Sequence, residues 1–209
     1  NKMTVVQCAA PDETLLARAM SLCSDAVPDE TGKAVGEPTE CALVDYATKC
    51  GLPKGALEAV YPRVGEAPFD SMRKRMSTLH EHAGKVVQYT KGAPDEVLRL
   101  CDTYLTEGGE VLPLTEEARA KILGEMTKMA DQALRVLGAA QREYDALPAN
   151  LSSETLEQGM TFLGLAGMID PVRPEVKPAI EECKRAGIRV VMITGDHKNT
   201  AVAIAKELG

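Results

Sequence analysis

"RMSTLHEHAGKVVQYTKG", residues 75–92, is the stretch that decides the fold. Two runs of strand-forming residues flank Ala83 and Gly84, and this arrangement predicts a β-hairpin. A second hairpin is predicted for "TYLTEGGEVLPL" (103–114), with its turn at Gly108 and Gly109. We therefore expect an antiparallel sheet in the first part of the chain.

Helices are predicted on both sides of these hairpins. Apolar residues recur at helical spacing behind an acidic first turn in "PDETLLARAMSLCSD" (11–25). "EPTECALVDYATKCG" (37–51) has a proline near its start and a glycine after its end, as helices often do. A long helix is predicted over 115–138, running into the strand "VLGAAQREY" (136–144). The expected fold is α+β, with helices packed on an antiparallel sheet.

The pattern changes after residue 150. "TFLGLAGMID" (161–170) and "IRVVMITGD" (188–196) are apolar runs, and a helical pattern follows each of them. This alternation predicts a parallel α/β sheet that is buried on both faces. Two strands are too few for such a sheet, so we expect residues 150–209 to be part of a domain whose remainder lies outside the chain.

Composition excludes several classes of protein. The chain has 209 residues, 44% of them hydrophobic, which is enough for one large domain or two unequal ones. We expect a soluble protein, because the longest apolar runs fall short of the roughly 20 residues that a membrane span needs. A net charge of −7 argues against a nucleic-acid partner, which would require a basic face.

Cysteine and histidine give little support for a metal site. The six cysteines are scattered without a C-x-x-C pair, which indicates reduced, mostly buried thiols of a cytosolic protein. His80 and His82 share one face of a predicted strand, but the sequence offers no third ligand beside them. We therefore predict an exposed strand face there and no metal site.

Candidate functional residues occur where the two apolar runs after residue 150 end. Thr194, Gly195 and Asp196 stand directly before a helix, and Asp170 ends the earlier run. Open α/β sheets bind ligands at this edge, and two neighbouring carboxylates need a cation or a positive partner. The simpler alternative is a turn in which Asp196 only caps the helix.

Four motifs occur in order along the chain: "FDSMRKRMS" (69–77), "KGAP" (91–94), "DPVRPEV" (170–176) and "MITGDHKNTAVAIAKELG" (192–209). Together they resemble the cytoplasmic catalytic region of P-type cation-transporting ATPases, in particular type II pumps similar to the calcium ATPases. The opening "NKMTV" resembles the sequence that follows the family's phosphorylated-aspartate motif, D-K-T-G-T-L-T. That motif and the later T-G-D-G-x-N-D motif do not occur within residues 1–209.

The resemblance implies two domains. Residues 1–149 would be a nucleotide-binding domain, inserted into a phosphorylation domain with a haloacid-dehalogenase-like α/β fold. Residues 150–209 would be one piece of that second domain. The change of pattern near residue 150 agrees with this division.

The resemblance also assigns residues to the adenosine side of an ATP pocket. Lys91 and Gly92 would line its deep part, where glycine lets the backbone approach the ligand. Phe69 matches the family's adenine-stacking residue, and the chain has only two phenylalanines and no tryptophan. Glu40 matches a carboxylate near the adenine amino group. Without the resemblance, Lys91 would be a solvated strand end and Phe69 a core residue.

On the phosphate side, the resemblance assigns Lys74 and Arg135, with Leu137 beside the arginine. Ser71 departs from the calcium-pump pattern, in which an arginine is expected at this position. The resemblance places the following residues near phosphoryl transfer, where they would orient phosphate and Mg²⁺: Asp170, Thr194, Gly195 and Asp196.

The expected function is ATP binding, with Mg²⁺, in a pump that couples ATP hydrolysis to transport through an aspartyl-phosphate. Calcium is the expected ion, by resemblance alone. The expected partners are ATP and the rest of the pump, on the cytoplasmic side of a membrane, and the fragment is expected to be a monomer. The alternatives are a haloacid-dehalogenase-like phosphatase with a large cap and a stand-alone ATP-binding regulatory module.

Overall fold

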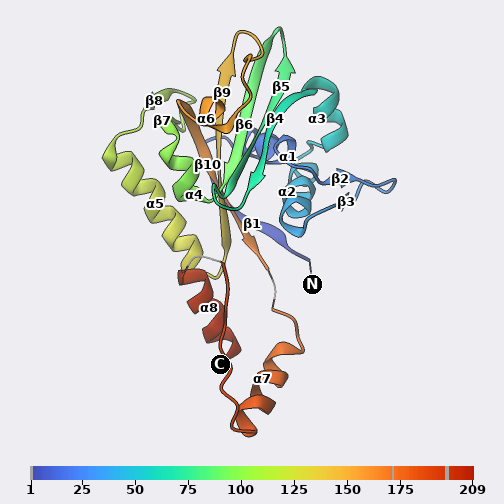
Figure 1. Ribbon diagram of the computed structural model, residues 1–209, viewed down its shortest axis with the longest axis vertical. Helices are drawn as coiled ribbons and strands as arrows, with labels where there is room; N and C mark the ends of the chain where they lie inside the picture. The colour runs from blue at the N-terminus through green and yellow to red at the C-terminus, as the bar shows by residue number, and fades with distance from the viewer. Residues whose placement is uncertain (1, 171, 196–197) are drawn as a thin grey trace.

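The computed structural model describes residues 2–170, 172–195 and 198–209. Among these residues, one sheet of eight strands runs in the order β4-β5-β6-β9-β10-β7-β8, and β1 pairs with β10 (Figure 1). Its strands are β1 (Thr4–Ala9), β4 (Arg63–Asp70), β5 (Arg75–His82), β6 (Lys85–Gly92), β7 (Cys101–Leu105), β8 (Val111–Pro113), β9 (Arg135–Tyr144) and β10 (Met160–Ile169). A separate small hairpin consists of β2 (Val27–Pro28) and β3 (Ala34–Val35).

Helices surround the large sheet and extend beyond it (Figure 1). They are α1 (Glu13–Leu22), α2 (Pro38–Lys49), α3 (Lys54–Val60), α4 (Pro94–Arg99), α5 (Glu116–Asp131), α6 (Ser153–Leu156), α7 (Val176–Arg185) and α8 (Lys198–Leu208). The predicted α+β architecture, with helices packed on a largely antiparallel sheet, is confirmed. None of the helices in the described ranges is long and apolar enough to cross a bilayer.

Both predicted hairpins are present. β5 and β6 pair in an unbroken antiparallel register, and the turn between them places Ala83 and Gly84 at positive φ angles of 49° and 77°. Two successive residues in the left-handed region are typical of tight hairpin turns, which favour glycine. In the β7–β8 hairpin, Gly109 takes a φ of 78°. Turn chemistry was therefore a sufficient signal for both hairpins.

The predicted long helix ends earlier than expected. Helix α5 stops at Asp131, whereas the prediction continued to Gly138. Ala133 has a φ of 60°, in the left-handed region, and this residue reverses the chain into β9. Alanine favours helices and seldom occupies that region, so no residue at this position indicates the end of the helix.

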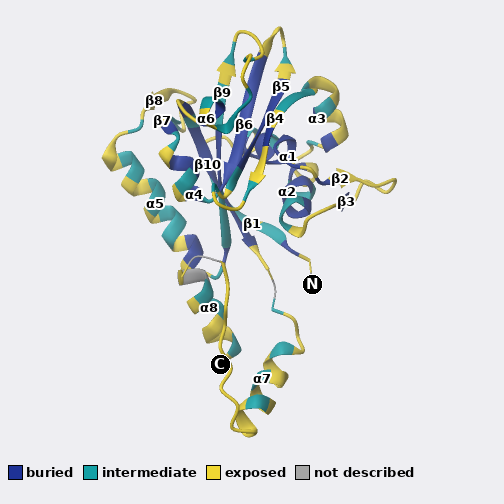
Figure 2. Cartoon of the chain, viewed as in Figure 1, coloured by how far each residue is buried: buried dark blue, intermediate teal, exposed yellow. Residues whose placement is uncertain are grey.

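The core has two layers, one on each face of the sheet. Strand β9 alternates between them: Leu137 and Ala139 pack in the cluster under α1 and α2, whereas Val136 and Ala140 pack in the cluster under α4 and α5. Figure 2 shows the sheet interior buried along most of its length. The central strands are therefore covered on both faces.

Strand β10 corrects one prediction. Its apolar run was expected to begin a separate parallel sheet, but β10 pairs antiparallel with β1 and β9, and parallel with β7. A continuous apolar run indicates burial on both faces, and the centre of this covered sheet satisfies that requirement equally well. The division at residues 149 and 150 stays a prediction.

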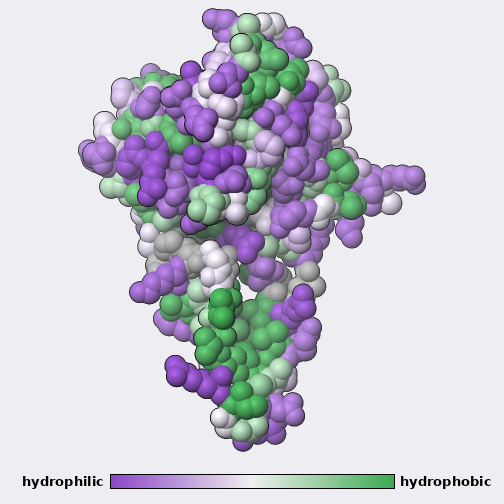
Figure 3. All heavy atoms as spheres, viewed as in Figure 1, coloured by the Kyte–Doolittle hydropathy of each residue, from purple (hydrophilic) through white to green (hydrophobic). Residues whose placement is uncertain are grey.

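The second expected parallel strand is also corrected. The described part of that run, residues 188–195, forms no strand and is exposed, with Ile193 93% accessible. A strand needs a neighbour for its backbone hydrogen bonds, and no described segment pairs with this one. Figure 3 shows apolar atoms gathered on the lower part of the molecule, around α7, α8 and this segment.

Candidate functional site

A cavity of about 910 Å³ opens between several elements that are far apart in sequence. Its walls come from the start of α2, the β4–β5 turn, the end of β6, the start of β9 and one face of α5. All seven residues predicted for the nucleotide pocket line this one cavity: Glu40, Phe69, Lys74, Lys91, Gly92, Arg135 and Leu137.

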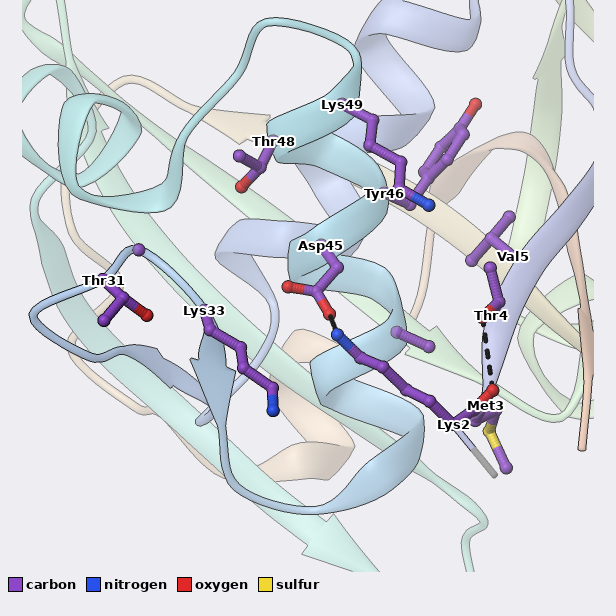
Figure 4. A pocket seen from close by; sticks show the side chains of 12 residues that line it. Lys2, Met3, Thr4, Val5, Thr31, Lys33, Asp45, Tyr46, Thr48 and Lys49 are labelled. Carbon is purple, nitrogen blue, oxygen red and sulfur yellow. Dashed lines mark hydrogen bonds and ion pairs between the residues drawn. The ribbon is translucent and has the colours of Figure 1, made fainter.

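A smaller cavity of about 320 Å³ lies between β1, α2 and the β2–β3 loop (Figure 4). Lys2 and Asp45 form an ion pair there, and Lys33 and Lys49 lie at its edge. None of the predicted site residues lines it. The predicted set therefore singles out the larger cavity.

Glu40 and Lys91 form a buried ion pair in the wall of the large cavity. The Lys91 Nζ lies 2.6 Å from Glu40 Oε1, and it also donates to the carbonyl of Cys23. Glu40 Oε2 accepts from the backbone N–H groups of Asp25 and Ala26, at 2.9 and 3.1 Å. A charge pair removed from water needs such additional hydrogen bonds to be tolerated. Lys91 is therefore a wall residue with protein partners, and the alternative of a solvated strand end is wrong.

Gly92 is required by the protein backbone. A Cβ at this position would lie 2.4 Å from the carbonyl oxygen of Lys74 and 2.5 Å from the Cβ of Arg75. The backbone N–H of Ala93 donates to the same Lys74 carbonyl, at 3.0 Å. The glycine thus lets the end of β6 lie directly against the β4–β5 turn, a reason different from the predicted approach to a ligand.

The β4–β5 turn presents Phe69 and Lys74 to the cavity. Phe69 is 63% exposed, so the alternative of a core phenylalanine is wrong. Asp70 organises the turn, because its Oδ1 accepts from the N–H groups of Met72 and Arg73 at 3.0 and 2.8 Å. Lys74 then takes a left-handed φ of 55°, which directs the chain into β5. An exposed aromatic face and an ammonium group consequently stand on one short turn.

Strand β9 supplies another part of the cavity wall. Arg135 and Leu137 are two residues apart, so their side chains lie on the same face of the strand. The Arg135 Nη1 donates to the hydroxyl of Thr39 at 3.3 Å, which links β9 to the first turn of α2. Leu137 is partly buried against the core cluster under α1. This part of the cavity wall therefore rests on regular secondary structure.

The predicted phosphoryl-transfer residues are only partly brought together. Thr194 and Gly195 line the large cavity. Asp170 is exposed just after β10 and does not line the cavity, and Asp196 lies outside the described residues. Their expected proximity depended on two neighbouring parallel strands, which the described residues do not form.

Comparison with known proteins identifies the family of the chain. The sequence profile of the family described as "P-type ATPase, cytoplasmic domain N" matches residues 13–175. The chain belongs to this family. A calcium-transporting ATPase of Bacillus cereus is 46% identical over 94% of the chain, and one of Lactococcus lactis is 40% identical over 100%. A cation-transporting ATPase of Synechocystis is 39% identical over 90% of the chain.

The chain spans about a quarter or less of the length of these relatives. It covers 22%, 25% and 21% of their sequences. Residues 1–12 lie before the family match, and β10 lies within it. The central strand that sequence patterns placed in another domain thus belongs to the matched region.

Several residues that line the large cavity were not predicted from the sequence. Met126 and Ala130 are four residues apart on α5 and turn the same face of the helix to the cavity, and Thr39 holds Arg135. Helical spacing was the available signal for Met126 and Ala130. Asp95, in the first turn of α4, was visible as an acidic helix start but was not connected with the cavity.

His80 does not lie on an exposed face. It is buried, with Nδ1 2.9 Å from the carbonyl oxygen of Tyr61 and Nε2 2.9 Å from the hydroxyl of Thr78. Burial lowers the pKa of His80 to about 4, because the imidazolium form would lose its hydration. His82 stacks on the Tyr61 ring, with 4.0 Å between ring centroids. The described residues contain no group of three potential ligands suited to a metal ion.

The six cysteines are all free thiols. Cys23, Cys41 and Cys101 are buried, and Cys50 is exposed, so the prediction of mostly buried thiols holds only in part. Burial raises the pKa of Cys101 to about 12, which leaves that thiol protonated and unreactive at neutral pH.

Proposed function

We propose that this chain binds ATP in the large cavity, as the nucleotide-binding part of a cation pump. The observation that carries the proposal is the convergence of the seven residues on one cavity, although the first and last of them lie on different elements, α2 and β9. The family membership supports it independently.

The cavity offers each chemical group that ATP requires. Phe69 provides an exposed aromatic face on which adenine can stack, and stacking suits a pocket that also holds a few polar groups. Lys74 and Arg135 provide positive charge for the phosphates from two different elements, the β4–β5 turn and β9. The Glu40–Lys91 pair gives a polar wall whose remaining lone pairs can receive the amino group of the base.

Mg²⁺ is proposed as an ion carried by the triphosphate, where it would offset phosphate charge. The contribution proposed for the described residues is to position the nucleotide through Phe69, Lys74 and Arg135. In the whole protein, we propose that the γ-phosphate passes to the aspartate of a D-K-T-G-T-L-T motif before Asn1. Thr194, Gly195, Asp196 and Asp170 are proposed to lie near that transfer, within a phosphorylation domain to which residues 150–209 belong.

We further propose calcium as the transported ion, because the relatives from Bacillus cereus and Lactococcus lactis are named calcium-transporting ATPases. The proposed partner is the rest of the pump, on the cytoplasmic side of its membrane. The exposed apolar run at residues 188–193 supports this, because a parallel sheet completed by other segments would cover it. The chain alone is proposed to be a monomer that binds no nucleic acid.

Titration of the chain with ATP tests the proposal, by calorimetry or by NMR shifts. We expect a dissociation constant of about 0.1–1 mM, since the pocket by itself holds the base but not the transferred phosphate. Shifts should appear at Phe69, Gly92 and Leu137 first. The absence of any response at about 10 mM ATP, ten times the weak end of that range, would overturn the proposal.

A further inference from the structure

The basic run 73–75 divides its charges between two sides of the sheet. Lys74 lines the large cavity, whereas the side chains of Arg73 and Arg75 reach Glu157, which follows α6. The left-handed φ of Lys74, 55°, turns the chain at this residue, so the lysine can face a ligand while the two arginines face away. The two arginines therefore have a purpose other than contact with the nucleotide.

Glu157 is the point on which both arginines converge. Its side chain is only 1% exposed, and its Oε1 is bound by Arg73 Nη1 and by the Ser77 hydroxyl, the latter at 3.2 Å. Its Oε2 accepts from Arg75 Nε at 2.7 Å. Glu96 adds a second negative charge, 3.7 Å from Arg75 Nη1. Glu157 is thus paired with two guanidinium groups, and Glu96 with those of Arg75 and Arg99, which makes a partly buried cluster tolerable.

Both arginines also donate hydrogen bonds to backbone carbonyls at the β4–β5 turn. Arg73 Nη2 donates to the carbonyl of Pro68 at 2.7 Å, directly before Phe69. Arg75 Nη1 donates to the carbonyl of Arg73 at 3.0 Å, directly before Lys74. One carboxylate therefore holds, through two guanidinium groups, the backbone on which both ligand-facing side chains stand.

The turn has little other support from packing. Phe69 and Met72 are exposed, Met72 to 88%. Besides the local hydrogen bonds to Asp70, the turn is held by the hydrogen bond from the Ala93 N–H to the Lys74 carbonyl, at 3.0 Å. We infer that Glu157 is a positioning residue for the bound nucleotide, holding the β4–β5 turn so that Phe69 and Lys74 face the cavity together. This inference rests on the proposed ATP binding and assigns a role in it to a residue that lies outside the cavity.

The Glu157→Gln variant tests this role, because it keeps the shape of the side chain and removes its charge. We expect the amide NMR signals of Met72, Arg73 and Lys74 to shift or broaden in the absence of nucleotide. The dissociation constant for ATP should rise about tenfold, the size of effect seen when groups that orient a binding residue are removed. Adding Arg75→Gln to Glu157→Gln should cost less than the sum of the two single changes, because both act through one contact.

Val86→Ala is the control, since Val86 is buried in a core cluster and its apolar side chain takes no part in the ion pairs of Glu157. It should lower the melting temperature and leave the ATP dissociation constant of the folded protein unchanged. If Glu157→Gln does not fold, Arg73→Gln replaces it. The Arg73 side chain is 23% exposed, and this variant removes only one of the two ion pairs of Glu157. Its amide shifts and weaker ATP binding are then the expected result.

Two outcomes would overturn the inference. A folded Glu157→Gln protein with wild-type ATP affinity and unchanged turn amides would leave Glu157 with a purely structural role. A wild-type chain that does not bind ATP would remove the proposed function and this inference with it, so the two failures are distinguishable.

Discussion

The Glu40–Lys91 pair should be the most sensitive point of the cavity wall. Replacing Lys91 by methionine keeps most of the side-chain length but removes the ammonium group that contacts Glu40 Oε1 and the Cys23 carbonyl. The Glu40 carboxylate would then keep its two backbone donors, from Asp25 and Ala26, but would lose the cation that is hydrogen-bonded to it. A buried charge without its partner is strongly destabilising.

The expected loss can be estimated from these contacts. Breaking a buried ion pair by removal of one partner costs about 3–5 kcal/mol. A chain of this size loses about 2–4 °C of melting temperature for each kcal/mol, so Lys91→Met should melt about 6–20 °C lower. Replacing both partners, as Lys91→Met with Glu40→Gln, should recover part of that loss, because the glutamine can still accept from the backbone donors without a net charge.

Urea unfolding followed by circular dichroism measures these differences directly. Lys74→Met is the matched control: it is the same substitution at an exposed lysine of the same cavity, and it should change stability by less than about 0.5 kcal/mol. A Lys91→Met protein as stable as the Lys74→Met protein would refute the reasoning. So would a double variant whose loss equals the sum of the two single losses.

Three further predictions concern single residues. Phe69→Ala should weaken ATP binding by about 1–3 kcal/mol in calorimetry and leave the melting temperature nearly unchanged, because the ring is exposed; a large drop in melting temperature would contradict this. The pKa of His80 is about 4 in the folded protein and lies below its unfolded value of about 6.5. Up to about 3 kcal/mol of stability, present above pH 6.5, should therefore be lost as the pH falls from 6.5 to 4. His80→Gln should remove this pH dependence of stability, and His82→Gln should retain it. Gly92→Ala should cost about 1–3 kcal/mol in thermal unfolding, whereas Gly55→Ala, with open space around its Cβ in α3, should be neutral or slightly stabilising.

Local chemistry made much of the fold predictable from sequence. The β5–β6 and β7–β8 hairpins carry glycine at their turns, and α1 begins with Asp12, whose side chain accepts from the N–H of Leu15. The end of α5 was not predictable in this way, because Ala133 occupies a backbone region that alanine rarely adopts. The apolar run of β10 indicated burial on two faces but contained no information about which strands lie beside it.

The candidate site was predictable to a different extent. The residues that the resemblance assigns to an ATP pocket do line one cavity. From the sequence alone, Lys91 would be a solvated strand end and Phe69 a core residue. Their partners could not be predicted, because Lys91 meets Glu40 across 51 positions and Arg73 meets Glu157 across 84. A charge pattern shows that a lysine or an arginine is present, but only the fold decides whether it faces solvent, a ligand or a buried carboxylate.

The Glu40–Lys91 pair and the Glu157 cluster each join segments that are far apart in sequence. This explains why the cavity residues are spread along the chain. Glu40 comes from α2 and fixes Lys91 at the end of β6, whereas Glu157 follows α6 and fixes the turn before β5. The backbone of Gly92, next to Lys91, lies against the Lys74 carbonyl, so the two anchored segments meet at a contact that tolerates no side chain. Because each cluster holds one of the two touching segments, loss of either carboxylate should loosen the same corner of the cavity. The effects of Glu40→Gln and Glu157→Gln on the Lys74 amide signal should therefore couple, although the two carboxylates have no partner in common.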